Sequence, residues 1–207
     1  MIRFQDANTN FLHAMARARE MINLFDALSA LRPGNSANDD ALRAAYFQAV
    51  SSFDFFAHEI AAVEARHRLS TATPTRKIQL PMEILTAASA AERETSAENH
   101  IRSTNSYKAF VDPGKLAELL TCYCEEPWEK ICQRVVETHG LAVSAEELKA
   151  QLKSIWKRRN KIAHEADINP TLAGVSLWPI DKADTESTIE FLTKIATELP
   201  TVIATRF

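Results

Sequence analysis

One apolar stripe limits the possible folds of this chain more than any other feature. Asn38 and Asp39 are good residues for starting a helix, and apolar side chains then recur every three or four residues for about six turns. A stripe this wide predicts a long helix buried along most of its length, which we expect to be the core of the fold. Its members are Leu42, Ala45, Tyr46, Ala49, Val50, Phe53, Phe56, Ile60 and Val63.

Helical spacing also dominates the rest of the chain. We expect further helices over residues 7–31, 114–124, 127–139, from the capping box Ser144–Glu147 to about 164, and 184–199. The first of these should bury Leu12, Met15, Ile22, Phe25, Leu28 and Leu31. The only strand-like pieces, 79–81 and 175–180, are short. The pattern predicts a single all-α, bundle-like domain over residues 1–207.

The stretch 70–112 differs from the rest of the predicted bundle. Pro81 suits the first turn of a helix, but the apolar face that follows is thin and the sequence is strongly polar up to Asn105. We therefore expect a peripheral, irregular helical insertion here.

Composition excludes several classes of protein. The net charge of −3 and the pI of about 6.1 argue against a protein that coats nucleic acid by general positive charge. Three cysteines without a secretory signal indicate a reduced, cytoplasmic protein. No apolar run approaches the roughly 18 residues that a membrane span needs.

The common metal and cofactor motifs are absent. His58-Glu59 lacks the second histidine of a zinc-protease helix, and four scattered glycines allow no phosphate-binding glycine loop. The three cysteines with His139 have no second CxxC-type pair, which favours structural thiols over a zinc site: Cys122, Cys124 and Cys132. We therefore predict neither a metal nor a cofactor.

The stretch "KSIWKRRNKIAHEAD" (153–167) has two interpretations. Basic residues commonly complement the negative end of a helix dipole. Alternatively, an arginine fork and a titratable histidine suit phosphate chemistry. On an ideal helix Asn160 and His164 share a face, about 40° apart, whereas Arg159 lies about 140° from His164. Arg159 and His164 would meet only if the helix ends near His164 or if a second copy supplies the partner.

Residues Arg159 to His164 resemble the Arg-polar-x-x-x-His signature of HEPN domains. "LRAAYFQAVSSFDFFAHEI" (42–60) is similar to the long N-terminal core helix of the RiboL-PSP-HEPN subgroup, including its aspartate, here Asp54. "EPWEKI" (126–131), followed by the capped helix that carries "RRNKIAHEAD" (158–167), resembles the second half of the same subgroup. The resemblance covers most of residues 10–199 and is weakest over 70–105.

This resemblance implies a HEPN-like helical bundle and an endoribonuclease that needs no metal, often a toxin or a phage-defence effector. It implies that Arg159 and His164 are the catalytic pair and that Asn160 is the polar residue after the arginine. If the signature began at Arg158 instead, Arg159 would occupy the polar position after the arginine, which fits less well. HEPN nucleases typically act as dimers with two motifs facing one cleft, so the arginine of one copy could meet the histidine of the other.

We therefore expect RNA cleavage by attack of a 2′-hydroxyl, giving a 2′,3′-cyclic phosphate. Residues expected to support it, by steering RNA or from the long helix, are Lys157, Arg158, Lys161 and Asp54. The expected partners are RNA, a second copy and, as a further candidate, an antitoxin. The alternative is a non-catalytic module that binds RNA, a nucleotide or a protein. The negative net charge and the acidic neighbours Glu165 and Asp167 favour that alternative. A helical scaffold with an ordinary basic helix end is the third interpretation.

Overall fold

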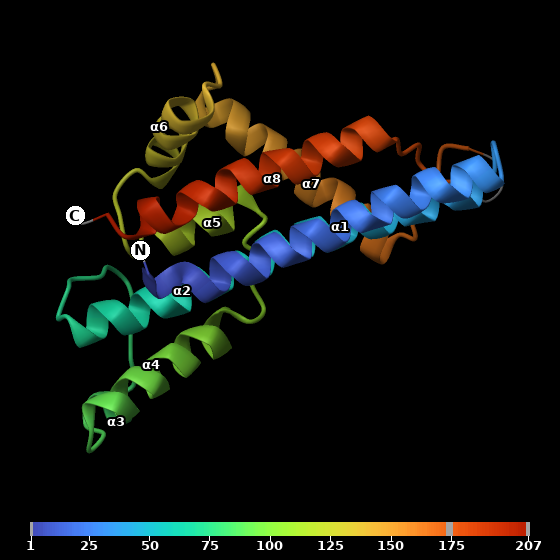
Figure 1. The fold of residues 1–207 in the computed structure, drawn as a ribbon. Helices are drawn as coiled ribbons and strands as arrows, with labels where there is room; N and C mark the ends of the chain where they lie inside the picture. The colour runs from blue at the N-terminus through green and yellow to red at the C-terminus, as the bar shows by residue number, and fades with distance from the viewer. Residues whose placement is uncertain (1, 173–175, 206–207) are drawn as a thin grey trace.

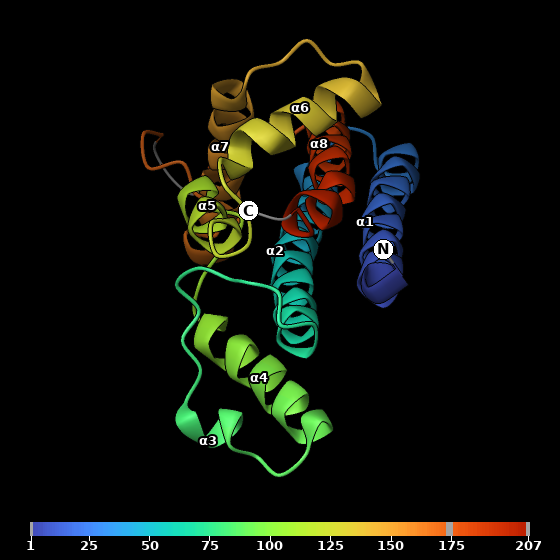
Figure 2. The ribbon, with the colours of Figure 1, turned by 90° about the vertical axis from the view of Figure 1, so that its left-hand side faces the viewer.

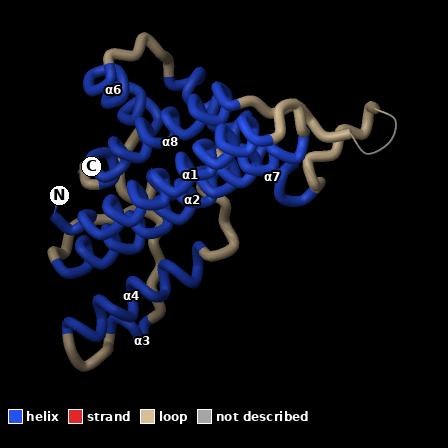
Figure 3. Tube along the Cα trace, turned by 45° about the vertical axis from the view of Figure 1, so that its right-hand side comes forward, coloured by secondary structure: helices blue, strands red, loops and turns tan. Residues whose placement is uncertain are grey.

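The computed structural model describes residues 2–172 and 176–205, and in this part of the chain helices are joined by loops, with no strand beyond one isolated bridge (Figures 1 and 3). Two short 3-10 helices, η1 (Ile2–Phe4) and η2 (Ser36–Asn38), precede the two longest α-helices. The α-helices are α1 (Gln5–Leu31), α2 (Asp39–Ser70), α3 (Met82–Leu85), α4 (Ala90–Asn105), α5 (Pro113–Leu120), α6 (Pro127–His139), α7 (Ala145–His164) and α8 (Lys182–Ile203). The predicted all-α fold is confirmed.

Helix α2 is the core of the bundle, as its stripe predicts. It packs against α1 along one side and against α8, α7 and α4 on others (Figures 1 and 2). Phe53, Ile60 and Leu42 have no exposed surface. The predicted stripe misses Ala41, Ala57, Ala61, Ala62 and Ala65, which are also buried. These small side chains let neighbouring helices approach α2 on more than one face.

The buried face of α1 agrees with the prediction only in part, at Met15, Ile22 and the partly buried Phe25. The side chains of α1 that face the core are Ala7, Phe11, Met15, Ala18 and Ile22, whereas Leu12 is 49% and Leu31 79% exposed. Phe11 rather than Leu12 contacts the core because its ring stacks against Phe56 of α2, with 4.9 Å between centroids. The prediction was wrong at Leu12 and Leu31, because it followed the large aliphatic side chains and left out Phe11 and the alanines.

The stretch 70–112 contains the single-turn helix α3 and the longer α4 (Figure 2). Helix α4 packs on α2 through a narrow face of Ala97, Ile101 and Asn105. Arg66 of α2 pairs with Glu94 and Glu98 across this contact. Of the strand-like pieces, 79–81 is not a strand, and Leu177 forms only an isolated bridge with Ile168. Val175 lies outside the described residues.

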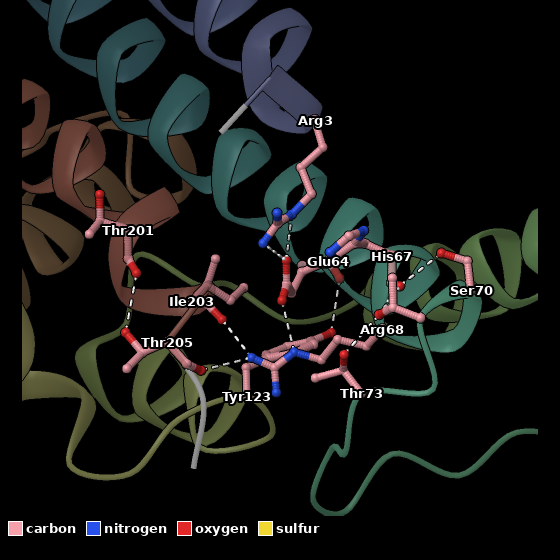
Figure 4. A network of polar contacts seen from close by, with 12 residues as sticks. Arg3, Glu64, His67, Arg68, Ser70, Thr73, Tyr123, Thr201, Ile203 and Thr205 are labelled. Carbon is pink, nitrogen blue, oxygen red and sulfur yellow. Dashed lines mark hydrogen bonds and ion pairs between the residues drawn. The ribbon is translucent and has the colours of Figure 1, made fainter.

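A buried polar cluster holds three distant parts of the chain together (Figure 4). Arg68, only 2% exposed, donates from Nε to Glu64 Oε1 at 2.8 Å, and Arg3 donates from Nε to the other oxygen of Glu64 at 2.8 Å. Arg68 Nη2 also donates to the carbonyl oxygens of Ile203 and Thr205, at 2.9 and 3.0 Å. The start of the chain, the end of α2 and the end of α8 are thereby joined at one place. No helix in the described ranges has both the length and the apolarity that crossing a membrane requires.

Candidate functional site

Helix α7 carries the basic octapeptide and is fixed at its beginning. Ser144 Oγ accepts from Glu147 N at 3.2 Å while Glu147 Oε2 accepts from Ser144 N at 2.8 Å, so the predicted capping box is present. Ile155 is 5% exposed and Ile162 packs partly against the core. These contacts fix the rotation of α7 and therefore which residues of the octapeptide face inward.

Arg159 and Asn160 are brought together beside α2. Arg159 Nη1 donates to Asn160 Oδ1 at 3.2 Å, and the guanidinium carbon lies 5.2 Å from the centroid of the Phe47 ring. The Nε of Arg159 is buried and has no hydrogen-bond partner in the described part of the chain. No carboxylate there lies within ion-pair distance of Arg159. Its positive charge is thus held near the surface without a direct ion pair among the described residues, which suits a group that meets an anion.

Asp54 of α2 lies in the electrostatic neighbourhood of this arginine. Burial raises the pKa of the Asp54 carboxyl, and among the opposing influences are His58, the amide of Val111 and Arg159. Val111 N donates to Asp54 Oδ1 at 3.1 Å. Burial lowers the pKa of His58, which Asp54 opposes. The predicted supporting residue is therefore a half-buried acid on the helix that faces Arg159.

Arg158 points elsewhere. Its Nη1 and Nη2 donate to the two carboxylate oxygens of Asp167 at 2.6 and 2.9 Å, and Nη2 also donates to Pro179 O at 3.1 Å. Arg43 of α2 donates from Nε to Asp167 Oδ2 at 2.8 Å, and Asp167 is 1% exposed. The Arg158 side chain therefore ties the end of α7 to the following turn and to α2, and it is not grouped with Arg159.

Lys161 and Lys157 lie on the outer side of α7. Lys161 Nζ is 4.0 Å from the centroid of the Trp178 ring, in a cleft of about 490 Å³ between α7 and α8 that Arg158 also lines. Trp178 Nε1 is buried and makes no hydrogen bond within the described ranges. Lys157 is exposed. A cation stacked on an indole at the edge of a cleft is a surface that a nucleic-acid base or backbone can contact.

His164 is the last residue of α7 and is exposed. Helical geometry places it about 20° from Lys157 and 60° from Lys161, on the solvent side, with Arg159 about 140° away on the side that faces α2. The helix does end at His164, but no hydrogen bond or ion pair joins it to Arg159 among the described residues. One chain therefore presents the two candidate catalytic side chains on different faces.

Sequence reasoning missed the roles of Asp167, Arg43 and Phe47. It counted Asp167 as an acidic neighbour that opposes RNA, whereas Asp167 is buried and neutralised by two arginines. Both Ala166 and Asp167 have positive φ, 49° and 57°, which turns the chain back so that Asp167 reaches Arg158. Only the tolerance of aspartate for this conformation gave any signal in the sequence. Glu165 remains an exposed acid at the helix end.

The three cysteines are free thiols. Cys132 Sγ donates to Val143 O at 3.2 Å and Cys122 Sγ to Glu118 O at 3.5 Å, while Cys124 is buried. In the ranges that the structure describes, no three or more His, Cys, Asp or Glu side chains lie close enough together to hold a metal ion. The acid Glu59 is paired with Arg102, an ordinary structural contact.

Comparison with known protein families adds to this geometry. The family model of RiboL-PSP-HEPN matches residues 16–205, which is most of the chain and includes α2 and all of α7. This chain belongs to the RiboL-PSP-HEPN family. No curated protein and no solved structure matches it. Membership in a HEPN family indicates a nuclease or an RNA-binding module, and the matched range contains the Arg159–His164 motif of this HEPN chain.

Proposed function

We propose that this HEPN protein is an endoribonuclease, of the toxin or phage-defence kind, acting in the cytoplasm on RNA without a metal. The observation that carries the proposal is that Arg159 has no ion pair among the described residues. It is the arginine of the motif, and its guanidinium has neither an ion pair nor a bond at Nε within the described residues. Its neighbour Arg158, by contrast, is fully engaged with Asp167. A structural arginine has partners like those of Arg158.

The chemistry assigned to each side chain follows from its nature. The ribose 2′-hydroxyl attacks the adjacent phosphorus, the bond to the 5′-oxygen breaks, and a 2′,3′-cyclic phosphate and a 5′-hydroxyl result. His164 assists the proton transfers, an effect of about 10²–10⁴-fold in rate. Arg159 stabilises the added negative charge on the phosphorane. Asn160, bonded to Arg159, orients the guanidinium.

The surface beside the motif supports RNA binding despite the net charge of −3. Lys157 and Lys161 flank His164 on the solvent side of α7, and Trp178 with Lys161 edges the adjacent cleft. Because Asp167 is neutralised within the fold, it does not add negative potential to this face. The acid left at the helix end is Glu165.

We propose further that the active site is composite, with Arg159 of one copy and His164 of the other, in a homodimer. The separation of the two side chains on α7 supports this arrangement. So does an apolar groove of about 570 Å³ between α1 and α2, next to Arg159. Phe55 in this groove is 59% exposed and Phe47, beneath Arg159, is 37% exposed. A second copy that covers these rings would bring its own motif near Arg159.

The first test is RNA cleavage in the presence of EDTA. Labelled RNA is incubated with the wild-type protein, with Arg159→Ala and with His164→Ala, and the products are resolved on a gel. We expect cleavage by the wild type and a loss of at least about 10²-fold in each variant. Lys153→Ala, one exposed lysine on the same helix, is the matched control. Equal cleavage by all four proteins would refute the assignment of the site.

A mixing experiment tests the composite arrangement. If each site takes Arg159 from one copy and His164 from the other, a heterodimer of Arg159→Ala with His164→Ala contains one intact site and one doubly damaged site. Equal co-expression should then restore about a quarter of the wild-type activity, because about half of the dimers are mixed and half of their sites are intact. No recovery from two folded, dimerising variants would place both residues in a single-chain site.

The dimer surface is tested by solution mass. Phe55→Glu places a charge in the apolar groove and should convert a dimer into a folded monomer, as light scattering and circular dichroism would measure. Leu85→Glu on α3, where the leucine is 44% exposed, is the control and should leave the mass unchanged. A wild-type protein that is monomeric at all concentrations, or a dimer unaffected by Phe55→Glu, contradicts the proposed surface.

The second candidate is a non-catalytic module that binds RNA, a nucleotide or a protein. Glu165, exposed next to His164, favours it, because a carboxylate there opposes a polyanion. Binding of RNA by the wild type without any product after prolonged incubation would support this candidate. A neighbouring antitoxin-like or phage-defence gene would support the nuclease, with the antitoxin as a third partner.

A further inference from the structure

The insertion over residues 70–112 encloses a cavity of about 330 Å³ with α5, away from the Arg159–His164 motif. Its floor is apolar and is built by Ile101, Phe110, Leu119 and Tyr123, of which Phe110 and Tyr123 are 1% exposed. The rest of the lining is mostly polar or charged. Small-molecule sites typically combine an apolar surface with polar groups that orient the ligand, and this cavity has both. The floor would therefore hold the apolar body of a ligand.

Three lysines from separate segments line this same cavity. Lys77 comes from the loop after α2, Lys108 from the loop after α4 and Lys115 from α5. Glu118, bonded to Lys115 at 2.9 Å, is the one acid among the residues described as lining it. The cavity thus carries an excess of positive charge in a protein whose net charge is −3.

Two of these ammonium groups lack a carboxylate. Lys108 Nζ donates to the amide oxygen of Asn105 at 2.9 Å, and Lys77 makes no hydrogen bond or ion pair in the described part of the chain. Lys77 has a φ of +58°, a left-handed conformation that lysine rarely adopts. Burial raises the pKa of the Cys122 thiol at this cavity, and the positive charges of Lys108 and Lys77 both oppose that rise. Both lysines therefore lie close enough to Cys122 to influence it.

We propose that this cavity is a binding site for a small molecule with an anionic head and an apolar body. The anionic head lies among Lys77, Lys108 and Lys115, where it gives a negative partner to the two lysines that lack a carboxylate. The apolar body covers Phe110 and Ile101. An uncharged apolar molecule leaves Lys77 and Lys108 without an anionic partner, and a bare inorganic anion leaves the floor uncovered.

The inner wall of the cavity offers a reporter of occupancy. The carbonyl oxygen of Lys108 lies 3.1 Å from His58 Nε2, and the Phe110 ring packs on the His58 ring with 4.4 Å between centroids. A ligand that contacts Lys108 and Phe110 changes the surroundings of the His58 imidazole. The ring proton resonances of His58 should therefore shift on binding, while those of the exposed His13 should not.

The proposal is tested by calorimetric titration of the full chain with phenyl phosphate, inorganic phosphate and benzyl alcohol. We expect saturable binding of one phenyl phosphate per chain, about tenfold or more tighter than inorganic phosphate, and no binding of benzyl alcohol. Lys77→Gln should weaken phenyl phosphate binding about tenfold, since it removes one charged contact. Thr104→Trp, which fills the cavity from the surface of α4, should abolish it.

Lys149→Gln is the matched control, because Lys149 lies on α7 outside the cavity and pairs with Glu146. Circular dichroism confirms that each variant is folded. Three results would overturn the proposal: no saturable binding of phenyl phosphate, binding by Lys77→Gln and Thr104→Trp that equals the wild type, or inorganic phosphate bound as tightly as phenyl phosphate. None of these results depends on RNA cleavage, so this site and the proposed nuclease are tested separately.

Discussion

Replacing Asp167 by asparagine tests whether the end of α7 is fixed by a buried charge. The carboxylate of Asp167 is 1% exposed and accepts from Arg158 and Arg43, so it neutralises two guanidinium groups at once. Asparagine has nearly the same shape and also tolerates the φ of 57° at this position. The substitution therefore removes the charge with little change in volume or backbone strain.

The size of the effect follows from what each arginine retains. Removing one partner of a buried ion pair costs about 3–5 kcal/mol. The Arg158 side chain is 21% exposed and Arg43 keeps its contact with the exposed Asp40, so we expect the lower end of that range. A loss of about 3 kcal/mol lowers the melting temperature of a chain of this length by about 6–12 °C.

Thermal unfolding followed by circular dichroism measures this change. Glu165→Gln is the control, because it removes the same charge from an exposed side chain two residues before Asp167. Its melting temperature should stay within about 2 °C of the wild type. Arg158→Met should be destabilised as Asp167→Asn is, whereas Arg159→Met should not be, since Arg159 has no ion pair in the described residues. An Asp167→Asn protein that melts within about 2 °C of the wild type would refute the reasoning.

Two further predictions concern one half-buried and one buried acid of α2. Burial raises the pKa of Asp54, so its stabilising contribution is complete below the unfolded-state pKa of about 3.9 and is lost as the pH rises through the folded-state pKa. Asp54→Asn, which keeps an acceptor for Val111 N, should therefore raise the melting temperature at pH 7, with a gain that shrinks towards pH 4; a gain independent of pH would contradict this. Glu64→Gln should cost about 3–5 kcal/mol in the free energy of unfolding, measured with urea, because it removes the charge of the buried partner that Arg68 and Arg3 share. The exposed Glu118→Gln is its control, and equal stability of the two variants would exclude a structural role for Glu64.

Most helices of this fold are predictable because their signals are local. Ser144 with Glu147 starts α7, Pro113 follows the capping Asp112 of α5, and Gly140, with a φ of +66°, ends α6. Each signal acts within a few residues of the boundary that it fixes. The buried face of α1 was harder to predict from the sequence. Which side of a helix is covered depends on the helix it packs against, here through Phe56 of α2.

The motif itself was predictable, whereas its surroundings were not. The angle between Arg159 and His164 follows from the pitch of an α-helix, and the structure places them on different sides of α7. The pairing of Arg43 with Asp167 joins residues 124 positions apart, so no local pattern shows it. The lysine-lined cavity is likewise assembled from three separate segments, and nothing in any one of them predicts it.

The buried cluster around Arg68 has a consequence for the order in which the chain folds during synthesis. Arg68 donates to the carbonyl of Ile203, 135 residues later, so the two long helices α1 and α2 leave the ribosome well before this contact can form. Until then the hairpin exposes apolar surface on α2 that α8 later covers. A partly synthesised chain is therefore an incomplete bundle, in which the α8-facing surface of α2 stays uncovered until the last helix is made.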